Sequence, residues 1–384
     1  MPLFVLAHFS HHLIAALLQP LLPLIRDDFK LDYAQAGWVV SAFTLAYGFS
    51  QLPAGWLADR IGARLLITIG ISGVAVAGLL AGLSPSYTIM VIFLVGMGIL
   101  GGGYHPAASP LVSASVEEKK RGRALGLHQI GGTASFFLTP LIAVGIATAL
   151  GTWRSSFIIL AILTFIFGII FYVMLGRRGN SSKAENGIQD NQAAAALIPG
   201  RLSSLIPFIV IGVAIQVTVF STISFIPLFA VDQLKTSENV GAALLAVAQF
   251  AGLWAGPLGG YLADRIGKVP VMLAVALATG PAIYLLNMVS IGWSIYAILL
   301  VMGVCQYVGM PVSEAYIISH SPQRNRSTIL GFYYFASRGG PGLLMPVMGY
   351  LIDRFSFGTA FTIVGSGMLV VALGCSLWFW RNRD

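Results

Sequence analysis

Gly55-Trp56-Leu57-Ala58-Asp59-Arg60-Ile61-Gly62 recurs 205 residues later as Gly260-Tyr261-Leu262-Ala263-Asp264-Arg265-Ile266-Gly267, with seven of the eight positions identical. The offset is about half of the 384-residue chain, and each copy places an Asp-Arg pair at the end of a long apolar stretch. Only 9% of the residues are charged, so a repeated pair of charges stands out. The repeat indicates that the chain is built from two related halves.

The composition predicts that lipid is the solvent of this chain. Hydrophobic residues make up 57% of it and the mean hydropathy is +0.84. A soluble domain is about half apolar and about one quarter charged, whereas this chain has more apolar surface than a water-soluble core can bury. We therefore expect an all-α membrane protein whose helices each use roughly 20 apolar residues to cross the bilayer.

Several function classes are disfavoured by the same data. The net charge of +8 comes from basic residues in short loops between apolar runs, so no nucleic-acid partner is expected. The two cysteines, Cys305 and Cys375, lie inside apolar runs without metal-ligand spacing. A phosphate-binding Gly-x4-Gly-Lys-[Ser/Thr] sequence is missing from the chain. We expect neither an enzyme nor a cofactor-dependent protein, and no resident metal.

The apolar runs predict twelve spans in two pseudo-symmetric bundles of six. The longest polar interruption divides the chain into an N-terminal bundle at 1–175, a linker at 176–203 and a C-terminal bundle at 204–384. The two halves have the pattern of parallel repeats. A shorter echo of the opening motif, Gly349-Tyr350-Leu351-Ile352-Asp353-Arg354, ends the eleventh span. The spans are predicted near 3–25, 34–57, 65–83, 87–113, 123–149, 153–175, 204–231, 239–262, 269–288, 292–318, 327–350 and 357–380.

The distribution of Lys and Arg predicts the orientation. If both termini and the linker are cytoplasmic, that side carries 16 of these residues and the other side 5, with Arg338 left inside a span. Positive residues collect on the cytoplasmic side of membrane proteins. We expect a multi-pass, monomeric protein of the cell membrane, with the lipid bilayer and a small-molecule substrate as its partners.

This organisation resembles the major facilitator superfamily, with Gly-x-Leu-Ala-Asp-Arg-x-Gly after spans 2 and 8. Within it, the first 145 residues are similar to drug exporters of the fosmidomycin-resistance type. Three stretches carry that likeness: His8 to His12 with Gln19 to Pro23, Tyr33 to Gly37 leading to Gln51-Leu52-Pro53, and Gly103-Tyr104-His105-Pro106 with Gly126 to Gly132. The chain departs from the expected His-x-x-Asn-Asp in span 1, where it has His11-His12 and no carboxylate.

The resemblance implies a secondary transporter and a conformational latch between the halves on the cytoplasmic side. A carboxylate at the C-terminal end of a helix is disfavoured by the helix dipole and needs another partner. Solvated loop charges that only mark topology are the alternative interpretation. The latch residues are Gly55, Asp59, Arg60, Gly62, Arg64, Gly260, Asp264, Arg265 and Gly267.

Two ionisable residues are predicted to lie near the middle of the membrane, where charges are costly. Glu314 follows Pro311 in span 10, and Arg338 precedes Gly339 in span 11. The functional interpretation assigns Glu314 to proton coupling and Arg338 to an anionic group of the substrate. A structural ion pair between the two helices is the alternative. Further candidates for the lining of a polar cavity are Gln216, Gln249, Gln306, Tyr307, Tyr333 and Tyr334.

Histidines form the other candidate group. His105 lies in a glycine-rich helix before Pro106, which leaves the Gly102 carbonyl without its helical partner. His8 and His12 share one helical face, and His128 and Gln129 lie in span 5. Proton or substrate handling and interhelical packing are both open for these residues. Two imidazoles do not make a metal site, although such a pair suits a transition metal.

We therefore expect alternating access around a central site, with export of a small molecule or drug in exchange for protons. The proton gradient takes the place of a cofactor as the driving force. Uptake of an organic anion by symport or uniport, a metal or metal-chelate carrier, and a membrane receptor without transport are the alternatives. The identity of the substrate lies beyond the sequence.

Overall fold

The computed structural model describes residues 1–117, 120–179, 201–322 and 326–382, and every regular element in them is a helix. The first half of the chain forms nine α-helices and one π-helical turn. Together they follow the six spans predicted for this half. They are α1 (Pro2–Ala15), α2 (Leu18–Phe29), α3 (Tyr33–Ile61), α4 (Ala63–Thr68), η1 (Ile69–Gly73), α5 (Val74–Gly82), α6 (Tyr87–Gly101), α7 (Tyr104–Ala114), α8 (Arg121–Leu150) and α9 (Trp153–Gly179).

The second half repeats this order, with short π and 3-10 segments at the ends or breaks of its long helices. The side chains of residues 201–204 and 326–327 lie outside the description. The elements are α10 (Arg201–Leu228), η3 (Phe229–Gln233), α11 (Glu238–Phe250), η4 (Ala251–Leu253), α12 (Ala255–Ile266), α13 (Lys268–Leu285), η5 (Leu286–Met288), α14 (Trp293–His320), α15 (Arg326–Arg354) and α16 (Phe357–Arg381).

The all-helical membrane fold predicted from composition is confirmed. Nine helical segments of the described chain are long and apolar enough to cross a bilayer, and the bent pair α11 and α12 makes a tenth. Helices also occupy the two remaining predicted spans, as α3 and α15. Twelve crossings and the division at 176–203 stay predictions, and most of that linker lies outside the described residues.

The fourth span is broken where its glycines and proline predict a bend. Helix α6 ends at Gly101 and α7 begins at Tyr104, so Gly102 and Gly103 form the joint. Pro106 lies in the first turn of α7, where its missing N–H costs nothing. The break turns His105 inward between the helices, and the cavity described below includes its side chain.

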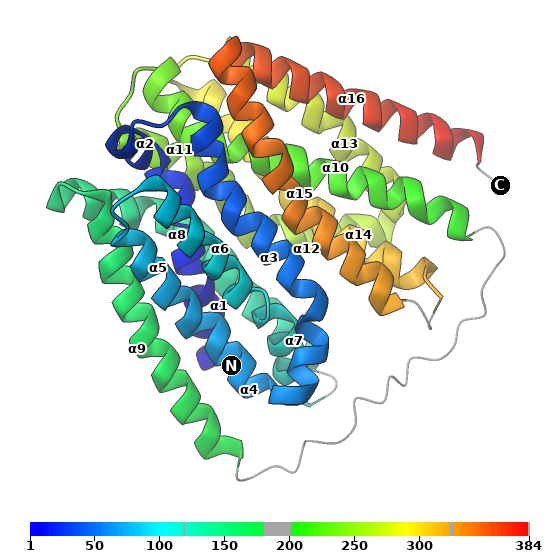
Figure 1. The fold of residues 1–384 in the computed structure, drawn as a ribbon. Coiled ribbons are helices and arrows are strands. Elements are labelled where there is room, and N and C mark those ends of the chain that lie inside the picture. The colour runs from blue at the N-terminus through cyan, green and yellow to red at the C-terminus, as the bar shows by residue number, and fades with distance from the viewer. Residues whose placement is uncertain (118–119, 180–200, 323–325, 383–384) are drawn as a thin grey trace.

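Helices of the two halves run side by side in pairs (Figure 1). Helix α3 packs along α15, α8 packs against α11, and α2 packs against α10 and α11. The face at which α9 ends and α10 begins is called the linker face, and the opposite face is called the far face. Helix ends alternate between them, so α3, α7, α12 and α14 all end at the linker face.

Glycines allow the main chains of α3 and α15 to touch. A Cβ atom built on Gly48 would lie 2.7 Å from the Cα of Gly339, and one on Gly37 would lie 2.7 Å from the Met345 oxygen. A Cβ atom on Gly349 would collide with the main chain of Tyr33 and Ala34. Lipid supplies no hydrophobic force between helices, so close packing of small residues replaces it.

We expect Gly349→Ala to lower the thermal stability of the detergent-purified protein, because main chain cannot move aside as a flexible side chain can. The matched control is Gly367→Ala in α16, where nothing lies within 4 Å of the new Cβ atom. That change removes the helix cost of a glycine, about 1 kcal/mol in water, so it should raise or preserve stability. Equal effects of the two variants in a thermal unfolding assay would contradict this account of the α3–α15 contact.

Candidate functional site

A cavity of about 790 Å³ lies between the two halves. Helices α3, α7 and α8 line it from one half, and α14 and α15 from the other. It reaches Leu125 and Thr328, which lie near the starts of α8 and α15 at the linker face. Its polar lining residues are Gln51, His105, Ser109, His128, Gln129, Glu314, Thr328, Tyr334 and Arg338.

Arg338 is the residue that connects this cavity to the interior. Two smaller cavities, of about 60 and 80 Å³, lie between the same halves, and Arg338 lines all three. The smaller two also contain Gln216 and Gln306, and the 80 Å³ cavity adds Gln249 and Tyr307. These four residues were predicted as candidates for a polar lining, and the structure places them together.

Glu314 and Arg338 line the same cavity without a direct ion pair between them in the described part of the chain. Arg338 Nη2 instead lies 3.0 Å from the sulfur of Met310. Tyr334 lines the same cavity. The structural ion pair considered from sequence is therefore not formed here, and both charged groups face space that a ligand can enter.

Neutral hydrogen bonds hold the inner polar residues in place. The Gln216 amide donates to the main-chain oxygen of Gln306 at 2.7 Å, and Tyr307 donates to Gln249 Oε1 at 2.5 Å. Gln306 Oε1 is buried and has no hydrogen-bond partner among the described residues. A buried acceptor left unpaired costs about 1–3 kcal/mol, so this oxygen favours a ligand that brings a hydrogen-bond donor.

The predicted histidines meet in the first half of the chain. His8 and His12 are buried on α1, His128 is buried on α8, and His105 reaches them from α7. The His8 ring stacks on His128 with 4.3 Å between centroids, and it lies 5.1 Å from the His105 ring. Gln129 is exposed on the cavity wall.

The far face is held shut by charged contacts between the halves. Arg26 at the end of α2 forms an ion pair with Asp232 in η3, and the Tyr33 hydroxyl donates to Asp232 Oδ2 at 2.8 Å. Asp353 at the end of α15 accepts hydrogen bonds from the Tyr33 and Ala34 N–H groups, each at 2.9 Å. Asp353 thereby caps the N-terminus of α3, where a helix dipole favours negative charge.

The sequence reasoning missed this closure, although one signal for it existed. Asp353 belongs to the third, partial copy of the opening motif. Arg26 and Asp232 were counted among ordinary loop charges, since sequence does not show which loops meet. Gln19 adds a further link, because its amide donates to Ser224 on α10 at 2.8 Å.

The motif residues at the linker face make their described contacts within their own half. The Arg64 guanidinium donates to the Tyr172 oxygen on α9 at 2.6 Å. Arg60 lies over the Trp56 ring and Arg265 over the Tyr261 ring, one turn back on their own helices. Gly62 and Gly267 have φ angles of 83° and 93°, which glycine adopts without strain.

For the remaining residues of the repeated Asp-Arg motif, the described structure gives no contact between the halves. Asp264 is exposed, Gly260 faces open space, and the side-chain environments of Gly55 and Asp59 lie outside the described residues. The latch predicted here stays a prediction, and the contacts seen between the halves lie on the far face instead.

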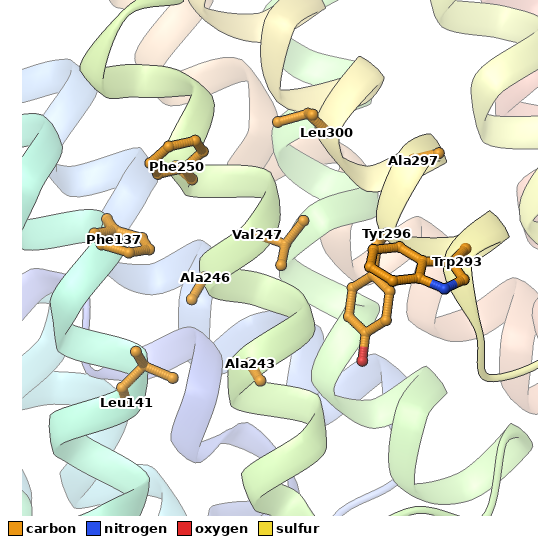
Figure 2. A pocket seen from close by; sticks show the side chains of 10 residues that line it. All are labelled: Phe137, Leu141, Ala243, Ala246, Val247, Phe250, Trp293, Tyr296, Ala297 and Leu300. Carbon is orange, nitrogen blue, oxygen red and sulfur yellow. The ribbon is translucent and has the colours of Figure 1, made fainter.

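Another cavity, of about 530 Å³, lies on the outer surface between α8, α11 and α14 (Figure 2). Its lining is apolar and includes Phe137, Phe250 and Trp293, all without charge. Trp293 is 90% exposed, which suits contact with lipid at the edge of the membrane. Because none of its lining residues carries a charge, this groove is not the candidate site.

A cavity between two similar helical bundles, with a closed far face, is the arrangement of a membrane transporter. The family model of the Major Facilitator Superfamily matches residues 4–252 and 208–384, and the chain belongs to this family. The curated relatives of this chain include proteins named "Multidrug resistance protein MdtG" and one named "Probable L-galactonate transporter".

Among the curated relatives, "Multidrug resistance protein MdtG" of Proteus mirabilis is 26% identical over 90% of this chain and 87% of its own length. "Uncharacterized MFS-type transporter YceJ" of Bacillus subtilis is 25% identical over 69% of this chain and 66% of its own. A POT family transporter solved with 5-aminolevulinic acid has a TM-score of 0.83 at 13% identity, covering 98% of this chain and 95% of that one.

A bacterial homolog to the human lysosomal transporter Spinster, solved in an inward-facing and occupied conformation, has a TM-score of 0.75 at 16% identity. It covers 100% of this chain and 96% of that chain. Likeness at this level of identity shows the fold alone. The resemblance to the major facilitator superfamily stated from sequence is confirmed by the family model.

The far-face contacts predict a measurable conformational bias. Ser224 is buried behind them, so Ser224→Cys, with Cys305 and Cys375 replaced by alanine, should react slowly with a maleimide. Adding Asp232→Ala removes contacts worth about 1.5–3 kcal/mol each. The minor state with an open far face should grow, and labelling should accelerate on the order of tenfold or more.

Asp28→Ala is the matched control. It breaks the Asp28–Arg154 ion pair, which lies on the same face but joins two helices of the first half. We expect it to leave the labelling rate of the cysteine at position 224 unchanged. If both variants accelerate labelling equally, the Asp232 contacts merely support local packing and do not hold the halves together.

Proposed function

We propose that this protein is a secondary active transporter that exports a small organic molecule in exchange for protons, by alternating access. The observation that carries the proposal is the cavity between the halves, which reaches the linker face while the Arg26–Asp232 ion pair and the hydrogen bonds of Tyr33 and Asp353 close the far face. A substrate in this cavity can leave toward only one face until those contacts break. The names of several relatives as multidrug resistance proteins support export of drug-like molecules.

Glu314 is the proposed proton carrier. It is the carboxylate in the cavity lining, and it lies on α14 opposite the cation of Arg338 on α15. A group drives antiport when proton and substrate compete for it, so that each leaves as the other enters. Tyr334 beside Glu314 can donate to the carboxylate when the proton is absent.

The orientation completes the proposal. If the linker face is cytoplasmic, as the Lys and Arg distribution predicts, the structure corresponds to a state that loads substrate from the cytoplasm. Breaking the Arg26–Asp232 contacts would then release it outside. A proton that enters from outside would neutralise Glu314 while the protein returns to the state that is open at the linker face.

One observation favours a second candidate, which is uptake of an organic anion. Arg338 lines all three cavities between the halves, and its guanidinium is free of a carboxylate partner among the described residues. A guanidinium matches a carboxylate or phosphate through two parallel hydrogen bonds. In this case Arg338 would anchor the substrate. Entry would be driven by a proton that moves with the substrate, or by the concentration gradient of the substrate itself.

The proton assignment is tested with Glu314→Gln in proteoliposomes that hold a pH gradient and an internal pH dye. Lipophilic cations, neutral drugs and organic carboxylates are added one at a time. We expect at least one class to dissipate the gradient through the wild-type protein but not through Glu314→Gln. Exchange of labelled for unlabelled compound without a gradient should survive in the variant, because it needs no proton step.

The control is Glu117→Gln, whose carboxylate is 62% exposed and pairs with Lys120 away from the cavity. It should transport like the wild type. Full proton-driven transport by Glu314→Gln would show that another group carries the proton. Failure of every compound class to move would contradict the transport proposal itself.

Arg338→Gln separates the two candidates. If an organic anion is the substrate, losing a charge-assisted contact of about 1.5–3 kcal/mol should raise KM for carboxylates roughly ten- to a hundredfold. For cationic or neutral cargo, the same variant should bind equally well or better. An unchanged KM for every class would remove Arg338 from the substrate site.

A further inference from the structure

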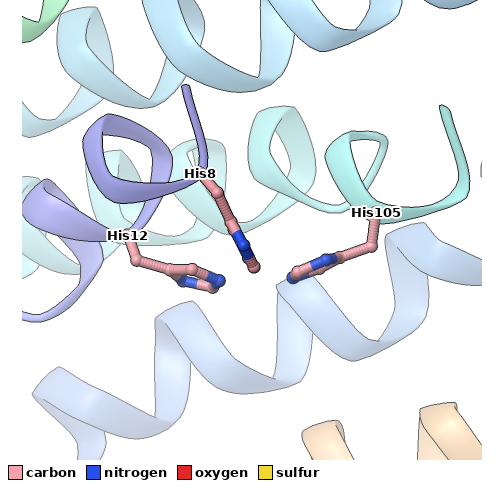
Figure 3. Close-up of side chains that lie close together, drawn as sticks. All are labelled: His8, His12 and His105. Carbon is pink, nitrogen blue, oxygen red and sulfur yellow. The ribbon is translucent and has the colours of Figure 1, made fainter. Parts of the chain in front are cut away.

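The strongest feature that the transport proposal leaves unused is a group of three imidazoles. His8 and His12 come from consecutive turns of α1, and His105 comes from the first turn of α7 (Figure 3). One ring nitrogen of each lies within 4.8 Å of a nitrogen of the other two. We infer that His8, His12 and His105 bind a transition-metal ion such as Zn²⁺, Ni²⁺ or Co²⁺.

The hydrogen bond of His8 fixes the ring in the form that a metal needs. Its Nδ1 atom lies 2.8 Å from the main-chain oxygen of His128, and a carbonyl can only accept. Nδ1 therefore carries the hydrogen and Nε2 carries the lone pair. Ligand histidines nearly always donate their other N–H group to a carbonyl or carboxylate in this way.

Two nitrogens of the triad lack hydrogen-bond partners among the described residues. They are Nε2 of His8 and Nε2 of His105, and both are buried. The His8 atom is an unpaired acceptor, which costs about 1–3 kcal/mol, and no hydrogen bond of the described residues prevents His105 from presenting Nε2 in the same form. A cation placed between them satisfies both at once, which a single hydrogen-bond donor from one side cannot do.

The neighbouring histidines have other tasks. His11 Nδ1 donates to the Gly70 oxygen at 2.8 Å, and its Nε2 lies 3.4 Å from the Tyr47 hydroxyl, so both nitrogens face away. His128 donates from Nδ1 to the Phe4 oxygen at 3.0 Å and stacks flat on His8; its Nε2 is also buried without a partner among the described residues, but it is not part of the triad. These contacts hold α1 against η1 and α8, and thereby position His8 and His12.

The ligand set selects the class of metal. Three neutral imidazoles without a carboxylate suit zinc, copper, nickel or cobalt, whereas Mg²⁺ and Ca²⁺ require oxygen ligands. Zn–N bonds of about 2.0–2.1 Å in a tetrahedron place the nitrogens about 3.4 Å apart. The side chains must move together by about an ångström, which rotations of His12 and His105 about their χ angles can supply.

The fourth coordination position faces the 80 Å³ cavity that Arg338, Gln216 and Tyr307 share with the triad. Three histidines plus one open position is the composition of an exchangeable zinc site rather than a closed structural one. The positive charge of Arg338 opposes a bare divalent ion there and favours one that carries an anionic fourth ligand. The site therefore accepts a metal ion together with a carboxylate-type ligand.

The test uses full-length protein purified in detergent through a tag that contains no histidine. Co²⁺ is titrated and followed by its visible absorption, which is intense for four-coordinate sites, and Zn²⁺ is then added as a competitor. We expect one Co²⁺ per chain, displaced by Zn²⁺. His12→Gln and His105→Gln should each weaken binding at least tenfold, and Arg338→Gln should tighten it.

His320→Gln is the matched control, since this histidine lies at the linker-face end of α14, outside the triad. It should bind Co²⁺ like the wild type. Each variant is checked by size exclusion and thermal unfolding, so that loss of binding is read only on folded protein. No stoichiometric Co²⁺ binding by the wild type, or full binding by both His12→Gln and His105→Gln, would overturn the assignment. Neither result bears on proton-driven transport through Glu314.

Discussion

The cost of placing polar groups in lipid governs this structure. Main-chain groups must be satisfied within each helix, and a charged side chain in the membrane needs a partner or a water-filled space. The charges of this protein obey that rule in two places. At the far face, Arg26 pairs with Asp232, and Asp353 caps the N-terminus of α3 in the opposite half. Glu314 and Arg338 instead face a shared cavity.

The interior polar groups divide into satisfied and unsatisfied sets, and the division has a pattern. His11, Gln216 and Tyr307 have partners and hold helices together. Among the described residues, His8 Nε2, His105 Nε2 and Gln306 Oε1 are buried without a partner, as are polar atoms elsewhere, those of Ser72 and Thr164 among them. His8, His105 and Gln306 border the same 80 Å³ cavity. A ligand that enters there meets groups that gain from its arrival.

Much of the fold could be predicted from sequence because a lipid environment restricts the sequence patterns that a chain can have. The length of an apolar run indicates a membrane-spanning helix, and Lys and Arg residues in the loops indicate the cytoplasmic side. The repeat at Gly55 and Gly260 indicates two related halves. The break at Gly102 was predictable for the same local reasons. Glu314 and Arg338 were found because charges inside apolar runs are rare, which makes each a strong signal.

What sequence could not supply was the geometry between halves. Nothing near Arg26 shows that a loop about two hundred residues away holds its partner, Asp232. Likewise, His8 and His12 formed an incomplete pair until the bend at Gly102 brought in His105. Whether Glu314 and Arg338 touch also depends on the cavity width, because helix spacing is set by small residues on other faces.

The glycine contact between α3 and α15 has a mechanical consequence. Near Gly48 and Gly339, two main chains meet with no side chains between them, so the two bundles bear directly on each other. If the two bundles rock against each other, this contact is a place where they can pivot, so motion on one side of it is matched by opposite motion on the other. A loosening near Asp353 would then become a tightening at the opposite membrane surface.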